Sequence, residues 1–315
     1  MIAFVFPGQG SQRVGMGKAL SETFPVCRRT FEEADEALAE PISRLCFEGP
    51  EDQLALTRNT QPALLAVSVA VDRLLRSRGH APAFLAGHSL GEYSAHVAAG
   101  TLGLADALRT VRRRGTYMQA AVPVGEGAMA AVLGLSAELV AQACAEAASG
   151  EIVSAANLNA PEQVAIAGHA AAVERAGRRA KELGARRVMP LPVSAPFHCA
   201  LMKPAEDRLA PELRSLVVAD PSAPVVANVD AEPKRTGREA VEALIRQVSA
   251  PVRWEAVVRR LLADGVTTFI EAGPGGVLSG LIRKIDRAAG ATRVHDPASL
   301  ESAEEKLRAM GAGVG

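Results

Sequence analysis

Apolar and polar positions follow two patterns along this chain, one of buried strands and one of amphipathic helices. An apolar run at residues 2–6 ends at the turn Pro7-Gly8-Gln9-Gly10 and predicts a buried strand. Leu64, Val67 and Val71 recur at the spacing of one helix face, which predicts a helix at about 60–78. Similar patterns predict helices at about 17–39, 91–99 and 104–121, and a strand at 83–87. A strand, a tight turn and a helix in succession form the unit from which parallel sheets are built.

The middle of the chain has a different order of elements. Strands are predicted at 128–135, 152–158, 163–167 and 187–193, and helices at 137–149 and 170–183. This βαββαβ order is that of a ferredoxin-like fold. We therefore expect residues 125–193 to form an inserted small subdomain, and residues 1–124 and 194–315 to form a large α/β domain.

The α/β alternation resumes after the predicted insert. Helices are predicted at 209–216, 238–248, 254–263 and 277–285, and strands at 225–229 and 268–271. Ser302 and Glu305 match a capping box and predict a short helix, followed by a frayed tail at 311–315.

Composition narrows the classes of protein to which the chain can belong. It has 315 residues, 48% of them hydrophobic, and 35 basic against 35 acidic residues give it no net charge. With 8 Phe, 2 Tyr and 1 Trp, it lacks the positive charge and the stacking surface of a nucleic-acid binder. No apolar run reaches the ~20 residues of a membrane span. The four cysteines are too widely spaced to suggest a metal site or a disulfide framework (Cys27, Cys46, Cys144 and Cys199). We expect a cytoplasmic protein with no metal.

The segment Gly87-His88-Ser89-Leu90-Gly91 joins a predicted strand to a predicted helix, which is the setting of a G-x-S-x-G nucleophile elbow. The glycines permit a sharp turn that lifts the serine hydroxyl clear of the sheet edge. The helix that follows directs backbone N–H groups and the positive end of its dipole toward a developing oxyanion. An ordinary turn between glycines is the alternative. We take Ser89 as the candidate nucleophile.

A serine nucleophile needs a base, and the chain has six histidines. His88 should point away from Ser89, and His96 lies about two helix turns farther on. His198 lies in a loop just after the predicted insert rejoins the large domain, which suits a cleft between the two. We predict that His198 is the base; the alternative is a structural loop histidine. Cys199 lacks an elbow and is expected to be a buried thiol.

The loop at residues 7–12 follows the first strand, as a phosphate-binding loop would. However, Arg13 occupies the third glycine position of a dinucleotide fingerprint, and Gln12 replaces a glycine of a Walker loop. NAD and ATP are therefore excluded as ligands of this loop. An amide at its tip can still supply hydrogen-bond donors, and a plain turn is the alternative.

Arg112, Arg113 and Arg114 are consecutive in the helix predicted at 104–121. At about 100° per residue, Arg113 points away from the apolar face, while Arg112 and Arg114 flank it. A flanking arginine beside a cleft can bind a carboxylate through two parallel hydrogen bonds, and helix geometry does not choose between the two. A second basic cluster on the predicted small subdomain suits either solvation or an acidic partner; its members are Arg175, Arg178, Arg179, Lys181, Arg186 and Arg187.

Together these motifs resemble the malonyl-CoA:acyl carrier protein transacylases, a family that includes acyltransferase domains of polyketide synthases. The resemblance runs from Phe4 to about Ile285 and rests on segments at 4–12, 87–95, 114–119, 156–160, 196–202, 228–231 and 271–275. It implies an α/β fold in which helices flank a hydrolase-like parallel sheet that carries the ferredoxin-like insert. The implied reaction moves a malonyl group from malonyl-CoA to a holo acyl carrier protein, for fatty-acid or polyketide synthesis.

The resemblance also implies roles for individual residues. Ser89 would be acylated, and His198 would act as general base and then as general acid. Gln247 matches a position whose main-chain or amide oxygen orients that histidine. The backbone N–H groups of Gln9 and Leu90 would form the oxyanion hole, in which one donor typically contributes ~10²–10³ in rate.

Substrate selection would fall to three further residues. Arg114, the family's arginine before a glycine, would bind the malonyl carboxylate, and Asn159 matches a position near the cleft. Phe197 would crowd an α-methyl branch and disfavour methylmalonyl-CoA. Members that serve fatty-acid synthesis often carry a smaller residue at that position, so the pathway stays open. Coenzyme A enters as part of the substrate, no cofactor is implied, and we expect a monomer that contacts its carrier protein through the basic cluster.

Two other classes of function compete with this one. A serine hydrolase would use serine, acid and histidine in that chain order. The interval between Ser89 and His198 is largely the predicted insert, whose acids are predicted on exposed helix faces. A catalytically silent module could bind a carrier protein through the basic cluster alone. The presence of Gln9, Ser89, Arg114 and His198 together favours the transferase.

Overall fold

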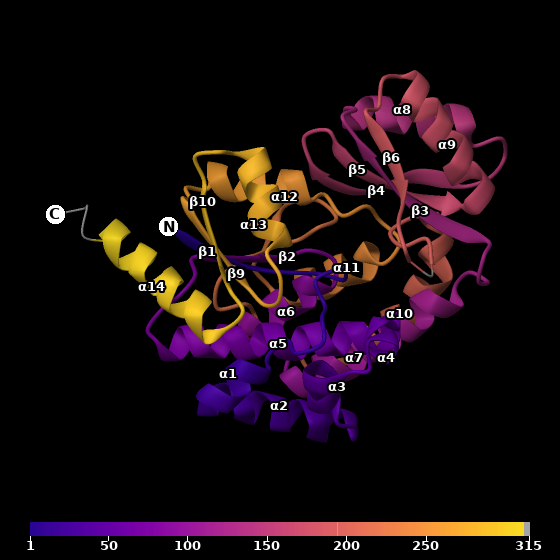
Figure 1. Ribbon diagram of the computed structural model, residues 1–315. Coiled ribbons are helices and arrows are strands. Elements are labelled where there is room, and N and C mark those ends of the chain that lie inside the picture. The colour runs from indigo at the N-terminus through magenta and orange to yellow at the C-terminus, as the bar shows by residue number, and fades with distance from the viewer. Residues whose placement is uncertain (194, 312–315) are drawn as a thin grey trace.

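Two β-sheets with helices packed on their faces make up the fold (Figure 1). The computed structural model describes residues 1–193 and 195–311. Within these residues the larger sheet has six strands in the order β10-β9-β1-β2-β7-β8, and the smaller has four in the order β4-β5-β3-β6. The α/β fold class predicted from the sequence, with a second sheet beside a helix-flanked parallel one, is confirmed.

Five strands of the larger sheet run parallel to one another. They are β1 (Ile2–Phe6), β2 (Phe84–Gly87), β7 (Val225–Val226), β9 (Thr268–Ala272) and β10 (Gly290–Val294). The edge strand β8 (Pro233–Lys234) is antiparallel to β7. Because parallel strands end at one edge of a sheet, the loops after β1, β2 and β7 lie together.

The central strand β1 faces two separate cores. Phe4 and Phe6 belong to one apolar cluster, and Ala3 and Val5 belong to another. The first cluster is covered by helices that lie below the sheet in Figure 1, namely α2 (Pro25–Leu38), α5 (Thr57–Ser77), α6 (Leu90–Ala98) and α7 (Leu104–Ala120). The second is covered from above by α12 (Trp254–Ala263) and α13 (Val277–Ile285). A strand buried on both faces accounts for the continuous apolar run at 2–6.

Shorter or peripheral helices complete the larger part of the molecule. They are α1 (Lys18–Thr23), α3 (Ile42–Glu48), α4 (Glu51–Ala55), η1 (Ala200–Met202), α10 (Lys203–Ser215), α11 (Gly237–Gln247) and α14 (Pro297–Gly311). Of these, α11 ends at the residue that contacts the candidate base described below.

The smaller sheet is antiparallel and has a core of its own. Its strands are β3 (Gly127–Leu133), β4 (Val153–Ala160), β5 (Gln163–His169) and β6 (Arg187–Pro190), and α8 (Ala137–Ala147) and α9 (Ala170–Glu182) pack on it. The separate core supports our proposal that residues 125–193 form a subdomain inserted into a large domain of residues 1–124 and 194–315.

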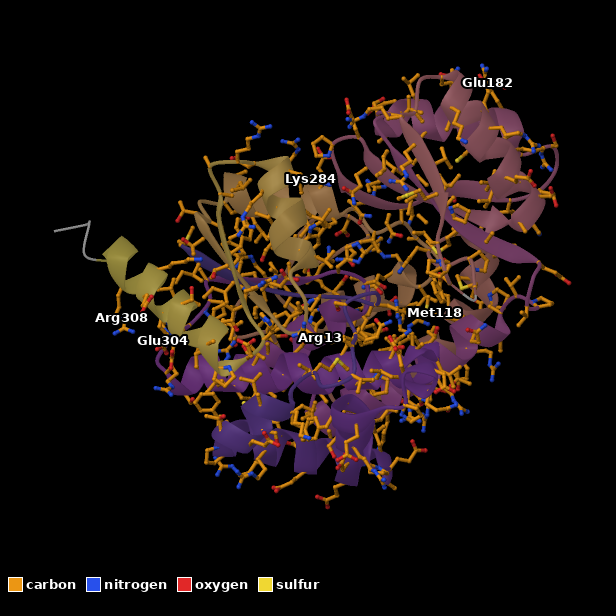
Figure 2. The ribbon with its side chains drawn as sticks, viewed as in Figure 1. Arg13, Met118, Glu182, Lys284, Glu304 and Arg308 are labelled. Atoms are coloured by element: carbon orange, nitrogen blue, oxygen red, sulfur yellow. The ribbon has the colours of Figure 1, made fainter. Side chains whose placement is uncertain are left out.

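Main-chain hydrogen bonds join the smaller sheet to the segment between α11 and α12 of the larger part of the molecule. Leu158 of β4 donates to the carbonyl of Val252 at 2.9 Å, and the N–H of Val252 returns a bond to Ala156 at 2.9 Å. Lys284 on α13 adds a side-chain bond to Gln163 of β5 at 2.7 Å (Figure 2). The smaller sheet is therefore held against the larger one on the side where the candidate site lies.

Some elements differ from those predicted. The single helix expected at 17–39 is two helices, because Pro25 restricts Phe24 to an extended conformation and separates α1 from α2. The helices α3 and α4 and the short strands β8 and β10 were not predicted. The strand expected at 225–229 has only two residues, since the chain turns after Val226.

The capping box predicted near the C-terminus is wrong. Helix α14 begins at Pro297, and the Asp296 carboxylate accepts the N–H of Ser299 at 2.8 Å, so Asp296 provides the cap. Ser302 and Glu305 lie inside this helix. Residues 312–315 of the expected frayed tail lie outside the described residues.

Two helical glycines provide a matched test of packing in this fold. A Cβ atom on Gly115 would lie 2.7 Å from the Thr57 carbonyl oxygen and 2.9 Å from the Cα of Arg58, whereas nothing lies within 4 Å of one on Gly280. We expect Gly115→Ala to lower the free energy of unfolding by ~1–3 kcal/mol, because the new Cβ would clash with backbone atoms of α5, which can move away only if the helix shifts. Gly280→Ala should raise it by up to ~1 kcal/mol through helix propensity. Urea unfolding of both variants measures the difference, and equal midpoints would contradict the close approach of α7 to α5.

Candidate active site

Ser89 lies on a sharp, strained turn between β2 and α6. Its backbone has φ 52° and ψ −108°, a conformation that a serine rarely adopts. A Cβ on Gly87 would lie 1.9 Å from the carbonyl carbon of Gly91, and one on Gly91 would lie 2.0 Å from the carbonyl oxygen of Phe6. Both glycines of the elbow are therefore required by close backbone contacts, as the sequence motif predicts.

Hydrogen bonds on both sides hold the Ser89 backbone in this conformation. The Ser89 N–H donates to Asn228 Oδ1 at 2.7 Å, and the Ser89 carbonyl accepts from Gln247 Nε2 at 3.0 Å. Asn228 also donates from Nδ2 to the carbonyl of Gly87 at 2.7 Å. Asn228 follows β7, so it reaches the elbow because β2 and β7 are adjacent parallel strands that end at the same edge.

His198 is placed to act on the Ser89 hydroxyl. Its Nε2 lies 2.7 Å from Ser89 Oγ, and its Nδ1 lies 3.0 Å from the main-chain oxygen of Gln247. A proton on Nδ1 satisfies that carbonyl and leaves Nε2 free to accept from the serine. The oxygen that orients the histidine is therefore that of the peptide, not that of the Gln247 amide side chain.

The surroundings of His198 favour its neutral form. Burial lowers its pKa to about 3, and the nearby positive charge of Arg114 acts in the same direction. An imidazole that is neutral at physiological pH can accept a proton from a hydroxyl. Cys199, the neighbour of His198, is a buried thiol, as expected, and burial raises its pKa to about 11, which favours the protonated form over the nucleophilic thiolate.

Arg114 is buried in the same site. Its side chain is 1% exposed and donates to Gln61 Oε1 at 2.9 Å, to Gln247 Oε1 at 2.9 Å and to Ser89 Oγ at 3.2 Å. Arg112 and Arg113 instead pair with surface acids, at 2.8 and 3.1 Å. Of the pair that helix geometry left open, Arg114 is the one that lies beside Ser89, whereas Arg112 pairs with Glu40.

A cavity of about 430 Å³ opens onto these groups, between the two sheets. Phe197 and Gln9 line it, and so does Met118 of α7 (Figure 2). Asn159 does not line this cavity; its Oδ1 lies 2.8 Å from His88 Nε2, and it borders a neighbouring cavity of about 280 Å³. Asn157, two residues earlier on β4, lines both cavities.

The two predicted oxyanion donors lie at this cavity in different ways. Leu90 is the first residue of α6, so its N–H has no acceptor within the helix and is available to a ligand. Gln9 follows β1 and lines the cavity, while its side chain donates to Thr57 Oγ1 at 3.3 Å. In the described part of the chain, no cluster of three metal-ligating side chains is present.

Three contributors to the site were missed by sequence reasoning. Gln61, Glu92 and Asn228 belong to no catalytic motif that can be recognised from residue types and spacing. They contribute through hydrogen bonds to other residues of the site. Glu92 and Asn228 lie within sequence segments that carry the family resemblance, which is the signal that could have drawn attention to them.

Comparison with known proteins is consistent with this geometry. The sequence profile described as the acyl transferase domain matches residues 3–296. The malonyl CoA-acyl carrier protein transacylase of Bacillus subtilis strain 168 is 50% identical over 308 residues, which are 98% of this chain and 97% of that protein.

Solved structures show the same relationship. An acyl carrier protein S-malonyltransferase from Vibrio cholerae is 50% identical, covers 96% of this chain and 99% of its own, and has a TM-score of 0.94. A malonyl-transacylase in complex with a type II PKS acyl-carrier protein is 48% identical, covers 97% of this chain and 99% of its own, and has a TM-score of 0.95. On this evidence, the chain belongs to the acyl transferase family, among the malonyl CoA-acyl carrier protein transacylases.

Proposed function

We propose that this protein transfers a malonyl group from malonyl-CoA to the phosphopantetheine thiol of an acyl carrier protein through an acyl-enzyme on Ser89. One observation carries the proposal. The Ser89 hydroxyl lies 2.7 Å from the neutral base His198 and 3.2 Å from the buried guanidinium of Arg114, at the wall of one cavity. The base and a group able to bind a carboxylate therefore both lie within hydrogen-bond distance of the nucleophilic oxygen, Ser89 Oγ.

The first half of the reaction forms the acyl-enzyme. His198 Nε2 accepts the Ser89 proton as the oxygen attacks the thioester carbonyl, and the N–H groups of Leu90 and Gln9 stabilise the tetrahedral oxyanion. As the C–S bond breaks, His198 returns the proton to the thiolate of coenzyme A. The imidazolium formed in between is stabilised by the Gln247 carbonyl, which accepts from Nδ1 at 3.0 Å.

The second half reverses these steps with a different thiol. The phosphopantetheine thiol gives its proton to His198 and attacks the Ser89 ester, and the serine takes the proton back when the ester bond breaks. Because one thioester is exchanged for another, the free energy of the products is close to that of the reactants. Hydrolysis of the acyl-enzyme would waste the malonyl group, so the site must exclude water from this intermediate.

Arg114 selects acyl groups that end in a carboxylate. An acyl chain without that charge fills the cavity but forgoes the charge-assisted hydrogen bonds that a terminal carboxylate would form with the guanidinium, so it binds less tightly. Phe197 lines the same cavity, and its ring supports a preference for malonyl over the branched methylmalonyl group.

A serine hydrolase is the runner-up. No carboxylate contacts Nδ1 of His198 in the described residues, since the peptide oxygen of Gln247 occupies that position. This arrangement, together with Arg114, supports transfer over hydrolysis.

The basic cluster proposed to contact the carrier protein carries fewer unpaired positive charges than the sequence indicates. Four members of the basic cluster, Arg175, Arg178, Arg179 and Arg186, pair with glutamates at 2.5–3.7 Å. One of these partners is Glu182, at the end of the smaller sheet's α9 (Figure 2). Among the described residues, Lys181 and Arg187 are exposed and carry no ion pair, so docking of an acidic carrier protein through this cluster would rest on them.

Location and assembly stay predictions. No described helix is both long and apolar enough to cross a membrane. The cytoplasmic location and the monomeric state are expectations from the sequence, and the sequence leaves both fatty-acid and polyketide synthesis open.

Intact-protein mass spectrometry tests the proposed function. After brief mixing with malonyl-CoA, we expect one malonyl group on the wild-type protein and none on Ser89→Ala, because the variant lacks the attacking oxygen. Addition of a holo acyl carrier protein should move the group to the carrier. Unmodified protein with accumulating free malonate would instead identify a hydrolase.

Arg114→Ala tests carboxylate selection. We expect a loss of about 10²-fold or more in kcat/KM for malonyl-CoA, because two charge-assisted hydrogen bonds disappear, and little loss with acetyl-CoA. Arg113→Ala is the matched control, since Arg113 lies at the surface and pairs with Glu212. An equal loss with both substrates would show that Arg114 supports the fold and not selection.

The pH dependence of Ser89 reactivity tests the state of His198. Since burial lowers the His198 pKa to about 3, the base stays neutral as pH falls through the ordinary histidine range. Labelling of Ser89 by a small uncharged sulfonyl fluoride should stay level from about pH 8 to about pH 5 and decline only below that. A half-loss of labelling near pH 6.5, with circular dichroism unchanged, would show that His198 titrates as an ordinary histidine.

A further inference from the structure

Glu92 is a buried carboxyl that the reaction described above does not use. It lies in the first turn of α6, three residues after the nucleophile, and its side chain is 0% exposed. Its Oε2 accepts from Gln247 Nε2 at 2.7 Å and from the Asn228 N–H at 2.9 Å. Its Oε1 has no hydrogen-bond partner among the described residues.

The Gln247 amide joins this carboxyl to Arg114. Arg114 donates to Gln247 Oε1 at 2.9 Å, and the same amide donates from Nε2 to Glu92 at 2.7 Å. Its oxygen faces the cation and its nitrogen faces the anion, so the amide dipole stabilises both charges. Within the described part of the chain no carboxylate contacts the Arg114 guanidinium directly, and Glu92 is the acid that the amide links to it.

The charge balance of the cavity must change when a malonyl group enters it. In the empty site one buried cation is matched by one buried anion. A malonyl carboxylate bound to Arg114 adds a second anion, which raises the pKa of the first. Because Oε1 has no partner, it can take a proton while both bonds to Oε2 remain.

We propose that Glu92 is the resident counter-charge of Arg114 and that it takes up a proton when a malonyl carboxylate occupies the cavity. Glu92 is then a positioning residue, since it acts on the substrate through Gln247 and Arg114. The inference rests on the proposed function, because it requires Arg114 to hold that carboxylate. The proton is released again when the malonyl group leaves on the carrier protein.

Among the titratable groups described around this site, Glu92 is the one whose protonation state can change near neutral pH. Burial and Asp230 raise its pKa to about 7, although Arg114 and the two hydrogen bonds oppose the shift. Asp230 stays charged, because Lys234 and Arg246 hold its pKa below its usual range. Tyr93 stays neutral, because burial raises its pKa to about 12. His198, as described above, is neutral too.

The direction of the pH effect follows from these states. Above about pH 7 the empty site holds a Glu92 carboxylate, so malonyl binding must draw a proton from solution. Affinity for malonyl-CoA should therefore fall as pH rises above about 7, by up to about tenfold per pH unit while one proton is taken up. Acetyl-CoA, which brings no carboxylate, should bind with no such dependence.

Calorimetric titration of Ser89→Ala with malonyl-CoA measures the proton directly, because that variant binds without acylation. In two buffers of different ionisation heat at about pH 8, we expect uptake approaching one proton per site, and none with acetyl-CoA. Adding Glu92→Gln should abolish the uptake while keeping an oxygen for Gln247 and Asn228. Adding Glu271→Gln, which alters another buried carboxyl that accepts two N–H groups, should leave the uptake unchanged.

The outcomes separate this inference from the proposed function. One result is that malonyl-CoA binds more tightly than acetyl-CoA yet without proton uptake, and another is that it does so with uptake that persists in the Glu92→Gln variant. Either result overturns the role of Glu92 and leaves the proposed function standing. Equal affinity for the two ligands would instead overturn the role of Arg114 in selection. Should the double variant not fold, equal proton uptake with malonyl-CoA and with acetyl-CoA in Ser89→Ala would still overturn the role of Glu92.

Discussion

The buried charge of Arg114 is the constraint on which the rest of the site depends. A guanidinium taken out of water is stable only if its donors are satisfied and its charge is compensated. Here Gln61 and Gln247 supply neutral acceptors, and the compensating carboxyl lies one amide away. Burial lowers the pKa of His198, and the charge of Arg114 adds to this effect, so the base stays neutral. Substrate selection, base chemistry and the polar framework beneath the nucleophile thus follow from one buried cation.

The fold brings these groups together through strand order. Gln9, Ser89 and Asn228 follow β1, β2 and β7, which are neighbours in the larger sheet, so one edge collects all three. The smaller sheet covers this edge, and the chain that returns from it carries His198. Main-chain bonds between β4 and Val252 fix the cover in place. The cavity is consequently a product of how the two sheets meet, and neither sheet could form it alone.

Sequence reasoning recovered the parts of this arrangement that are encoded locally. The elbow around Ser89 and the periodic helices are patterns of a few residues, so they could be read directly, and the family resemblance then distinguished Arg114 from Arg112. The bond between Arg114 and Gln247 joins residues 133 positions apart, and no local pattern reports it. Asn159 shows the same limit. It lies in the segment 156–160 that carries the family resemblance, yet its side chain contacts His88 and Asn157 is the β4 residue that lines the cavity. Strand β10 was missed because its neighbours in space, not its own residues, make it a strand.

The orientation of His198 by a peptide oxygen has a consequence for how such a site can change over generations. A side-chain acceptor is lost with a single nucleotide change, whereas the carbonyl at position 247 survives every replacement of the residue that bears it. Mutation can reach the amide side chain, which links the charges, without deleting the acceptor that aligns the base. At position 247 the main chain aligns the catalytic histidine, and the side chain sets the balance of charge around the acyl group, so the two properties can evolve separately. The second depends on the side chain at this position, while the first is protected by the backbone itself.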